Sequence, residues 1–408
     1  MANNRIFYAC QNLAITPEGK GSVDPGDMTH GVQSVGITTN FNLEQAFELG
    51  QIEIYENIEG TPDVELTMEK LLDGYPLLYH MASSGAVVGT AASGLAARGN
   101  AKCDVRLGIY NEVYNNIASD PSATSPVEVY MSGMFISNIS YTIPAEGSMT
   151  ESITLVGNNK QWLTAGAVNG YGASTIAAGD VNDFDGFDEP AAIAGASGGI
   201  QRREDVLLSG CILPRSIDGV VGSGYANAVS GVTALGTATP LIHIQNISIS
   251  TDFSREDVLE LGRKSPYYRP AGFPIEVTCE IEAITISGDF VGAYEFGDPA
   301  FDSTDDSGNN LRNENIFILT RAGYAWDLGS KNKISSVSYG GGDAGGGNVS
   351  VTYSYSNFND LDVQHRKNGY VGFGWLKNVA AGNAGDLDFG QGSLPDGLIG
   401  GGQSGPSY

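Results

Sequence analysis

Basic residues, cysteines and long apolar runs are all scarce in this chain of 408 residues. Lysine and arginine together number 21 against 47 aspartates and glutamates, which gives a formal net charge of −26. Proteins that bind nucleic acid by neutralising phosphates need clustered basic side chains, so the composition excludes that class. No segment approaches the ~18 apolar residues of a membrane-spanning helix. The polar first 20 residues predict no secretory signal.

Residue types that commonly hold metals or act as nucleophiles are few and scattered. The four cysteines form no C-x-x-C motif, which argues against a zinc site or disulfide scaffold and suits assembly in a reducing cytosol. The histidines show no ligand spacing, and no nucleophile elbow or phosphate-binding loop appears. We therefore expect no catalytic residue, no metal site and no cofactor.

One acidic stretch, residues 180–189, resembles a calcium-binding loop at first sight. Placing Gly186 at the obligatory sixth position of such a loop puts Val181 where the first ligand must be, which excludes an EF-hand. The prediction is a solvated acidic loop, and an adventitious cation site is the alternative.

The clearest feature present is an internal repeat. Residues 32–50 (VQSVGITTNFNLEQAFELG) recur as 244–262 (IQNISISTDFSREDVLELG), with eight identities in 19 positions at a constant offset of 212. A second pair of segments, 136–141 and 334–339, recurs at an offset of 198, as do 152–155 and 350–353. Two copies at this spacing indicate a tandem duplication of one domain. The predicted division is a first copy at 1–163, a Gly/Ala/Asp-rich linker or insertion at 164–199, a second copy at 200–378 and a Gly-rich tail at 379–408.

Local patterns predict mainly strands. Residues 33–41 alternate apolar and polar side chains, as half-buried strands do. Asn42 and Ser254 look like helix N-caps, with Gly50 and Gly262 as the stops, and so predict short helices over 43–49 and 255–261. The remaining expectations are a helix over 70–81, strands over 5–15, 64–69, 101–110, 126–139 and 202–214, a hairpin of 137–141 with 150–156, and a mobile loop at 340–347.

Residues 275–282 (IEVTCEIE) alternate strictly between apolar and polar side chains. Such a strand presents its polar residues on one face, and the first copy has the same arrangement at 65–69. One interpretation is an outer solvated face, and the other is the lining of an acidic, water-filled passage. On the second interpretation the lumen-facing residues are Glu65, Glu69, Glu276, Glu280 and Glu282.

Two blocks resemble the tail tube (major tail) proteins of long-tailed bacteriophages: REDVLELGRKSPYYRPAGFPIEVTCEIEAI and SGMFISNISYTIPAEGSMTESITLVGNNKQW. The resemblance covers 1–163 and 200–378. It implies a mainly β protein, with each copy a β-sandwich or half-barrel flanked by a short helix. Strands of neighbouring subunits would join into one inner β-barrel, with rings stacked through long loops. A ring of six domains would then need three duplicated chains, a homotrimer with pseudo-sixfold symmetry.

The resemblance also implies the setting and the partners. The chain would be assembled in the host cytoplasm and located in the virion tail, with no membrane partner. Its neighbours would be further copies of itself, the tail terminator and baseplate or tip proteins. DNA and a tape-measure protein would pass through the lumen without specific binding.

Two other functions stay open at the level of sequence. A virion decoration or adhesion protein with two β-sandwich domains would share the duplication and the absence of catalytic motifs. A carbohydrate hydrolase would need two carboxylates ~5–10 Å apart in a cleft, and the sequence singles out no such pair.

Overall fold

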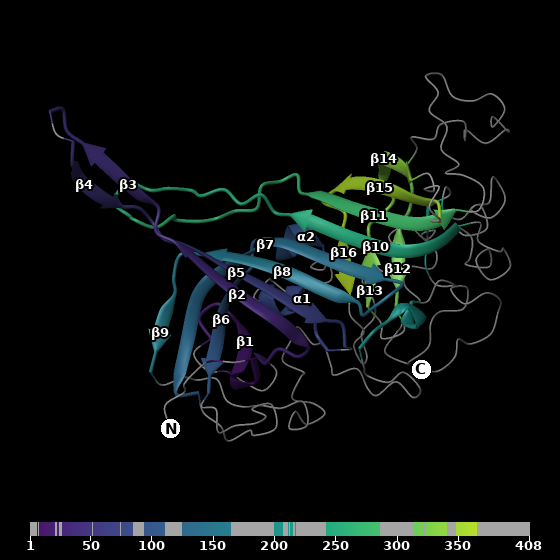
Figure 1. The fold of residues 1–408 in the computed structure, drawn as a ribbon, viewed down its shortest axis with the longest axis horizontal. Helices are drawn as coiled ribbons and strands as arrows, with labels where there is room; N and C mark the ends of the chain where they lie inside the picture. Colours follow the sequence, from purple (N-terminus) through teal and green to yellow (C-terminus); the bar gives the residue numbers. More distant parts are fainter. Residues whose placement is uncertain are drawn as a thin grey trace.

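The computed structural model shows a mainly β protein dominated by one large antiparallel sheet (Figure 1). The residues it describes are 6, 8–20, 23, 27–50, 52–73, 75–84, 94–110, 125–164, 200–206, 211, 213, 214, 217, 242–285, 313–320, 324–340 and 348–364. The acidic stretch 180–189, almost all of the linker 164–199, the loop 341–347 and the tail 379–408 lie outside these residues.

Eight strands form the main path of the sheet, in the order β14-β15-β11-β10-β7-β8-β5-β2. Their bounds are β2 (Val32–Asn40), β5 (Asp63–Leu71), β7 (Val127–Pro144), β8 (Thr150–Gly157), β10 (Ile242–Asp252), β11 (Glu276–Thr285), β14 (Lys333–Gly340) and β15 (Ser350–Phe358). Three further strands lie off this path: β6 (Lys102–Ile109) and β9 (Gln161–Leu163) pair with β7, and β1 (Gln11–Pro17) pairs with β6.

The path consists of two four-stranded units with the same internal order. The first repeat supplies β2-β5-β8-β7, and the second continues with β10-β11-β15-β14. Even the irregularities recur, because β2 and β10 have a register shift at Gln33 and Gln245. Likewise β7 and β14 shift at Ser137 and Ser335. The fold is thus a tandem duplication, and the described strands do not close into a barrel.

The strand registers also refine the alignment of the repeats. Leu66 lies opposite Ile37, and Cys279 lies opposite the matching Ile249. Leu66 therefore corresponds to Cys279, whereas matching the similar segments 65–69 (ELTME) and 276–280 (EVTCE) by sequence pairs it with Val277, two residues earlier. A displacement of two residues leaves every side chain on the same face of its strand.

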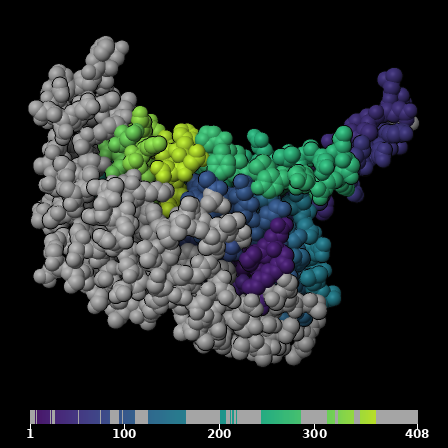
Figure 2. All heavy atoms as spheres, turned by 180° about the vertical axis from the view of Figure 1, so that it is seen from behind, coloured from purple at the N-terminus to yellow at the C-terminus, as the bar shows by residue number. Residues whose placement is uncertain are grey.

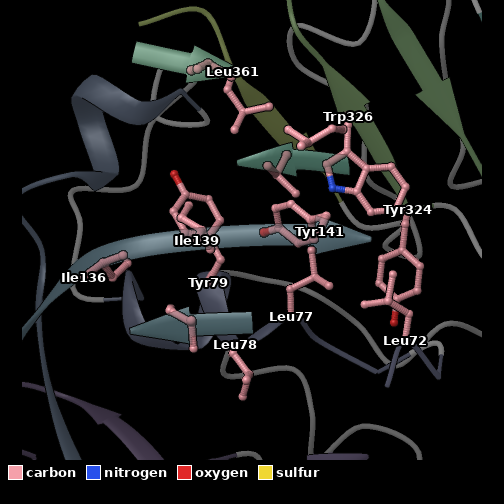
Figure 3. Close-up of a cluster of buried hydrophobic side chains, with 14 of the residues drawn as sticks. Leu72, Leu77, Leu78, Tyr79, Ile136, Ile139, Tyr141, Tyr324, Trp326 and Leu361 are labelled. Carbon is pink, nitrogen blue, oxygen red and sulfur yellow. The ribbon is translucent and has the colours of Figure 1, made fainter. Parts of the chain in front are cut away.

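One face of the sheet carries the hydrophobic core. Short elements cover it: α1 (Leu78–Ala82), α2 (Leu95–Arg98) and a small sheet of β12 (Phe317–Leu319), β13 (Ala325–Asp327) and β16 (Asp362–Gln364). In Figure 3, the ring of Tyr141 from the first repeat lies close to that of Trp326 from the second, with ring centroids 5.5 Å apart. The core is therefore continuous between the repeats, and each large side chain buried in it contributes about 1.5–3 kcal/mol.

The two predicted helices at 43–49 and 255–261 are absent, and this prediction is wrong. In the first repeat β3 (Leu43–Phe47) pairs with β4 (Ile54–Glu59) in a separate hairpin. In the second repeat the chain is extended, with a single bridge between Val258 and Tyr268. We call residues 41–62 the first arm and 253–274 the second arm.

The residues read as helix caps instead make turns that begin the arms. The side-chain Oδ1 of Asn40 accepts a hydrogen bond of 3.1 Å from the backbone N–H of Asn42. Asp252 does the same for Ser254 at 2.8 Å. Asn42 and Ser254 have φ of 47° and 42°, in the left-handed region that a helix start does not use. The signal for a turn was therefore mistaken for the signal for a cap.

The other predicted elements have mixed outcomes. The strands over 64–69, 101–110 and 126–139 and the hairpin with 150–156 are confirmed as β5 to β8. The strand over 5–15 begins later, as β1, after the 3-10 helix η1 (Tyr8–Cys10). The helix over 70–81 is reduced to α1, because β5 continues to Leu71 and Pro76 disfavours a helical residue before it. The strand over 202–214 is wrong for the described residues, where the Asp205 side chain accepts the Arg202 N–H and closes the 3-10 turn η5 (Arg203–Asp205).

Candidate functional site

The face of the main sheet opposite the core is polar along the whole path. The residues that alternate with the buried ones are mostly serine and threonine, for example Thr38, Thr154, Ser140, Ser250, Thr278, Ser354 and Ser338. Each of these seven side chains is exposed or half-buried. Lys333, at one end of β14, is a basic exception. We call this surface the polar face.

All five predicted glutamates lie on the polar face. Glu65 and Glu69 on β5 and Glu276 and Glu280 on β11 are exposed, and Glu282 is half-buried. The strand order places β8, β7 and β10 between the two groups, so the acidic rows are about 19 Å apart at ordinary strand spacing. In register the glutamates face hydroxyl, amide or apolar side chains, never each other. The result is an acidic, hydroxyl-rich surface and not a paired-carboxylate cleft.

The two repeats are joined edge to edge by pairing of β7 with β10. In this internal joint Tyr141 lies opposite Ile249, and Ile139 lies opposite Thr251. Tyr141, Ile139 and Ile249 are each at most 1% exposed, and Thr251 is also buried. The strand that ends the first unit is thus fully packed against the strand that begins the second.

Phe253 and Arg255 complete the internal joint. Phe253 is fully buried, and its backbone N–H donates to Ser137 O at 2.8 Å. The guanidinium of Arg255 donates to Ile136 O at 2.7 Å, to Arg269 O at 3.0 Å and to Gly99 O. It also lies over the Phe253 ring, 5.4 Å from the centroid. Burial lowers the pKa of Arg255 to about 10, so the side chain remains a cation at neutral pH.

The outer edges of the path, β2 and β14, carry the same residues without a strand against them in the described chain. Ile37, Thr39 and Phe41 repeat Ile249, Thr251 and Phe253, and Tyr339 repeats Tyr141. Phe41 is 61% exposed and Tyr339 is 53% exposed. The free edges therefore have the chemistry of the internal joint but not its burial.

The first arm projects from the body of the molecule, and the second arm runs beside its base (Figures 1 and 2). Nζ of Lys264 in the second arm lies 3.8 Å from Oε2 of Glu59 in the first arm. Arg269 forms an ion pair with Asp63, the first residue of β5. Large apolar side chains are exposed on both arms, including Leu43, Phe47, Leu49, Ile52, Tyr55, Leu259, Leu261 and Tyr267. Exposed apolar groups of this density are typical of interaction surfaces.

The described residues hold no group of three or more His, Cys, Asp or Glu side chains placed to bind a metal ion. None of the helices in the described ranges is long and apolar enough to cross a membrane. The polar face, the two edges and the arms are the candidate functional surfaces of the described residues.

Sequence reasoning found the glutamates of the polar face but missed the internal joint and the arms. The joint had a signal, because Ile37, Thr39 and Phe41 recur identically on one strand. Identity on a single face indicates that this face meets the same kind of partner in both copies. The local sequence pattern does not identify the partner strand.

No protein-family model matches the chain, and no curated protein matches its sequence. Among solved structures, the chain is similar to the tube-terminating cap of the anti-feeding prophage, with 14% identity and a TM-score of 0.28. That alignment covers 40% of this chain and 95% of the cap chain.

Two further solved structures are similar to the chain over a comparable part of its length. One is the sixfold-symmetrised baseplate of the anti-feeding prophage, with 10% identity, a TM-score of 0.29 and coverage of 40% of this chain and 97% of that chain. The other is the PVC sheath–tube complex of an extracellular contractile injection system, in the extended state. Its identity is 10% and its TM-score 0.28, over 40% of this chain and 93% of that chain.

Proposed function

We propose that the protein is a structural subunit of a phage-type tail tube, in which chains join edge to edge and the polar face lines the passage. The observation that carries the proposal is the contrast between Phe253, buried in the internal joint, and Phe41, exposed at the free edge. An unpaired strand edge with exposed apolar side chains is a ready-made site for pairing with another chain. Each chain has one such edge at either end of its path, so pairing propagates.

Head-to-tail pairing of this kind gives a closed ring when the rotation between units closes, and an open filament otherwise. The repeats give each chain two equivalent four-stranded units. The resemblance to tail tube proteins suggests six units around the ring, and three chains supply them. The arms, with their exposed leucine and aromatic side chains, are suited to contacts between successive rings.

The polar face supports the role of a conduit. DNA carries one negative charge per ~1.7 Å of helix axis, and basic side chains would hold it by pairing with phosphates. The glutamates of β5 and β11 have the opposite effect within a Debye length of ~8 Å at physiological salt. Serine and threonine side chains keep the rest of the wall hydrated, so DNA and a tape-measure protein pass without specific binding.

Sedimentation and negative-stain microscopy of the purified chain over a range of concentrations test the proposal. We expect rings and stacked hollow filaments at high concentration. Thr39→Pro should prevent them, because proline removes a backbone N–H that the repeat places on the free side of β2. The matched variant Thr39→Ser keeps that N–H and should assemble normally. Discrete monomers at every concentration would favour a decoration or adhesion protein instead.

A further inference from the structure

We infer that β14 of one chain pairs with β2 of the next in the register of the internal joint, so that this joint is a template for the contact between chains. The inference rests on the proposed function and adds the residues that meet. It uses the repeat itself, since β14 is the counterpart of β7 and β2 is the counterpart of β10. A second copy of this chain is therefore the partner of each free edge.

The register follows by moving each β7 residue forward by 198 positions and each β10 residue back by 212. The shared bulges at Ser137 and Ser335, and at Gln33 and Gln245, show that these offsets hold in the folded strands. The observed pairs Ile139–Thr251, Ser140–Ser250 and Tyr141–Ile249 then become contacts between chains. The deduced pairs are Val337 with Thr39, Ser338 with Thr38, and Tyr339 with Ile37.

The chemistry of the deduced pairs matches that of the internal joint. Tyr339 meets Ile37 as Tyr141 meets Ile249, with both residue types unchanged. Val337 and Ile37 already pack partly against the core of their own chain, so a partner strand would complete their burial. Phe41 would enter the position of Phe253, with its N–H directed at Ser335 O of the neighbour, as Phe253 N–H is at Ser137 O.

The hydrogen-bond pattern shows which pair comes closest. Phe253 N–H donates to Ser137 O, and Ala145 N–H donates to Gln245 O. Hydrogen-bonded pairs alternate along an antiparallel ladder, so every second pair between these two is also hydrogen-bonded. Ser140 and Ser250 fall between them and form a non-hydrogen-bonded pair, for which the Cα atoms are about 4.5 Å apart. The same holds for Ser338 and Thr38 across the chain boundary. A disulfide needs Cα atoms within about 7 Å, so this pair suits cross-linking.

The largest difference between the two joints is at Arg255. The guanidinium of Arg255 stabilises the internal joint by donating hydrogen bonds to three backbone carbonyls. Its counterpart in the first repeat is Leu43, which is 62% exposed. The joint between chains therefore has apolar contact where the internal joint has a charged clamp. The joint between chains is therefore the weaker of the two and can come apart. A subunit that exists alone before assembly requires this.

Disulfide trapping in the assembled full-length chain tests the register. The double variant Thr38→Cys with Ser338→Cys should form covalent trimers under mild oxidation, and closure of the ring should leave few larger species. The native cysteines are buried and should not contribute. The control Ser140→Cys with Ser250→Cys should cross-link within one chain without a change of mass. The off-register pair Thr38→Cys with Ser336→Cys should link poorly, since diagonal neighbours are ~7–8 Å apart.

The outcomes separate this inference from the proposed function. Rings in the micrographs with the off-register pair linking best, or with neither pair linking, would overturn the inference and leave the tube. Failure of both double variants and the unmodified chain to form rings would overturn the tube itself. Efficient linking of Thr38→Cys with Ser338→Cys in rings supports both.

Discussion

The hydroxyl of Tyr141 donates a hydrogen bond of 3.2 Å to Oε1 of Glu151 inside the core. The same carboxylate accepts the backbone N–H groups of Leu78 at 2.7 Å and Tyr79 at 3.0 Å, at the start of α1. Burial raises the pKa of Glu151, and the hydrogen bonds only partly oppose this effect. Glu151 thus fastens α1 to β8 with a carboxylate that is costly to ionise.

Stability should therefore depend on the protonation of Glu151. A raised pKa means that the folded state binds this proton more tightly than the unfolded state. The contribution is fully present below the ordinary glutamate pKa and is lost as the pH rises through the raised value. We expect the free energy of unfolding of the natural chain to fall over this window relative to Glu151→Gln, which cannot ionise. Denaturant titrations that run parallel for the two proteins would contradict this.

Phe41 and Phe253 form a matched pair for testing the edges. Phe253→Ala should reduce the free energy of unfolding of the single chain by roughly 3–5 kcal/mol, the usual loss for a buried phenylalanine. Phe41→Ala should change it by no more than about 0.5 kcal/mol, since the side chain is largely exposed. The effect of Phe41→Ala should appear as a higher concentration needed for ring formation. Equal effects of the two changes on chain stability would contradict the account.

Arg255→Leu places in the second repeat the residue that the first repeat has at this position. The change leaves three carbonyls without their donor and should lower the free energy of unfolding by roughly 2–3 kcal/mol. Denaturant unfolding of the dilute chain measures this loss. Leu43→Ala is the matched control at the repeat position and should have little effect. No loss for Arg255→Leu would show that the clamp is not needed to join the repeats.

The glutamates of the polar face can be tested by charge reversal. Glu276, Glu280 and Glu282 changed together to lysine should make assembled tubes retain short duplex DNA in a nuclease-resistant form, because the lumen would then pair with phosphates. Retention should fall steeply between about 50 and about 200 mM salt. Glu44, Glu48 and Glu56 of the first arm, changed likewise, should retain only digestible DNA. Nuclease-resistant DNA in the arm variant alone would place the polar face on the outside.

The local sequence made three features predictable: the mainly β fold, the duplication and the common face of the five glutamates. Apolar and polar residues alternate with a period of two, and the two copies repeat this alternation. The glutamates on β5 and β11 alternate with buried side chains as expected. The domain boundaries near 163 and 200 remain predictions.

The arms and the internal joint were not predictable by the same means. Asn42 and Ser254 are equally compatible with a helix cap or a turn. The turn forms because the side chains of Asn40 and Asp252 accept hydrogen bonds from their backbone N–H groups. Pairing of β7 with β10 joins segments about a hundred residues apart. Contacts between segments so far apart produce no periodic pattern in the local sequence. Only the repeated identities on one strand indicate them.

A cryo-EM reconstruction of the assembled protein tests the central claim most directly. We predict three chains per ring, a continuous sheet across each chain boundary with Tyr339 opposite Ile37, and Glu65 and Glu280 on the inner wall. An assembly in which β2 and β14 remain unpaired, or in which these glutamates lie on the outer wall, would contradict it.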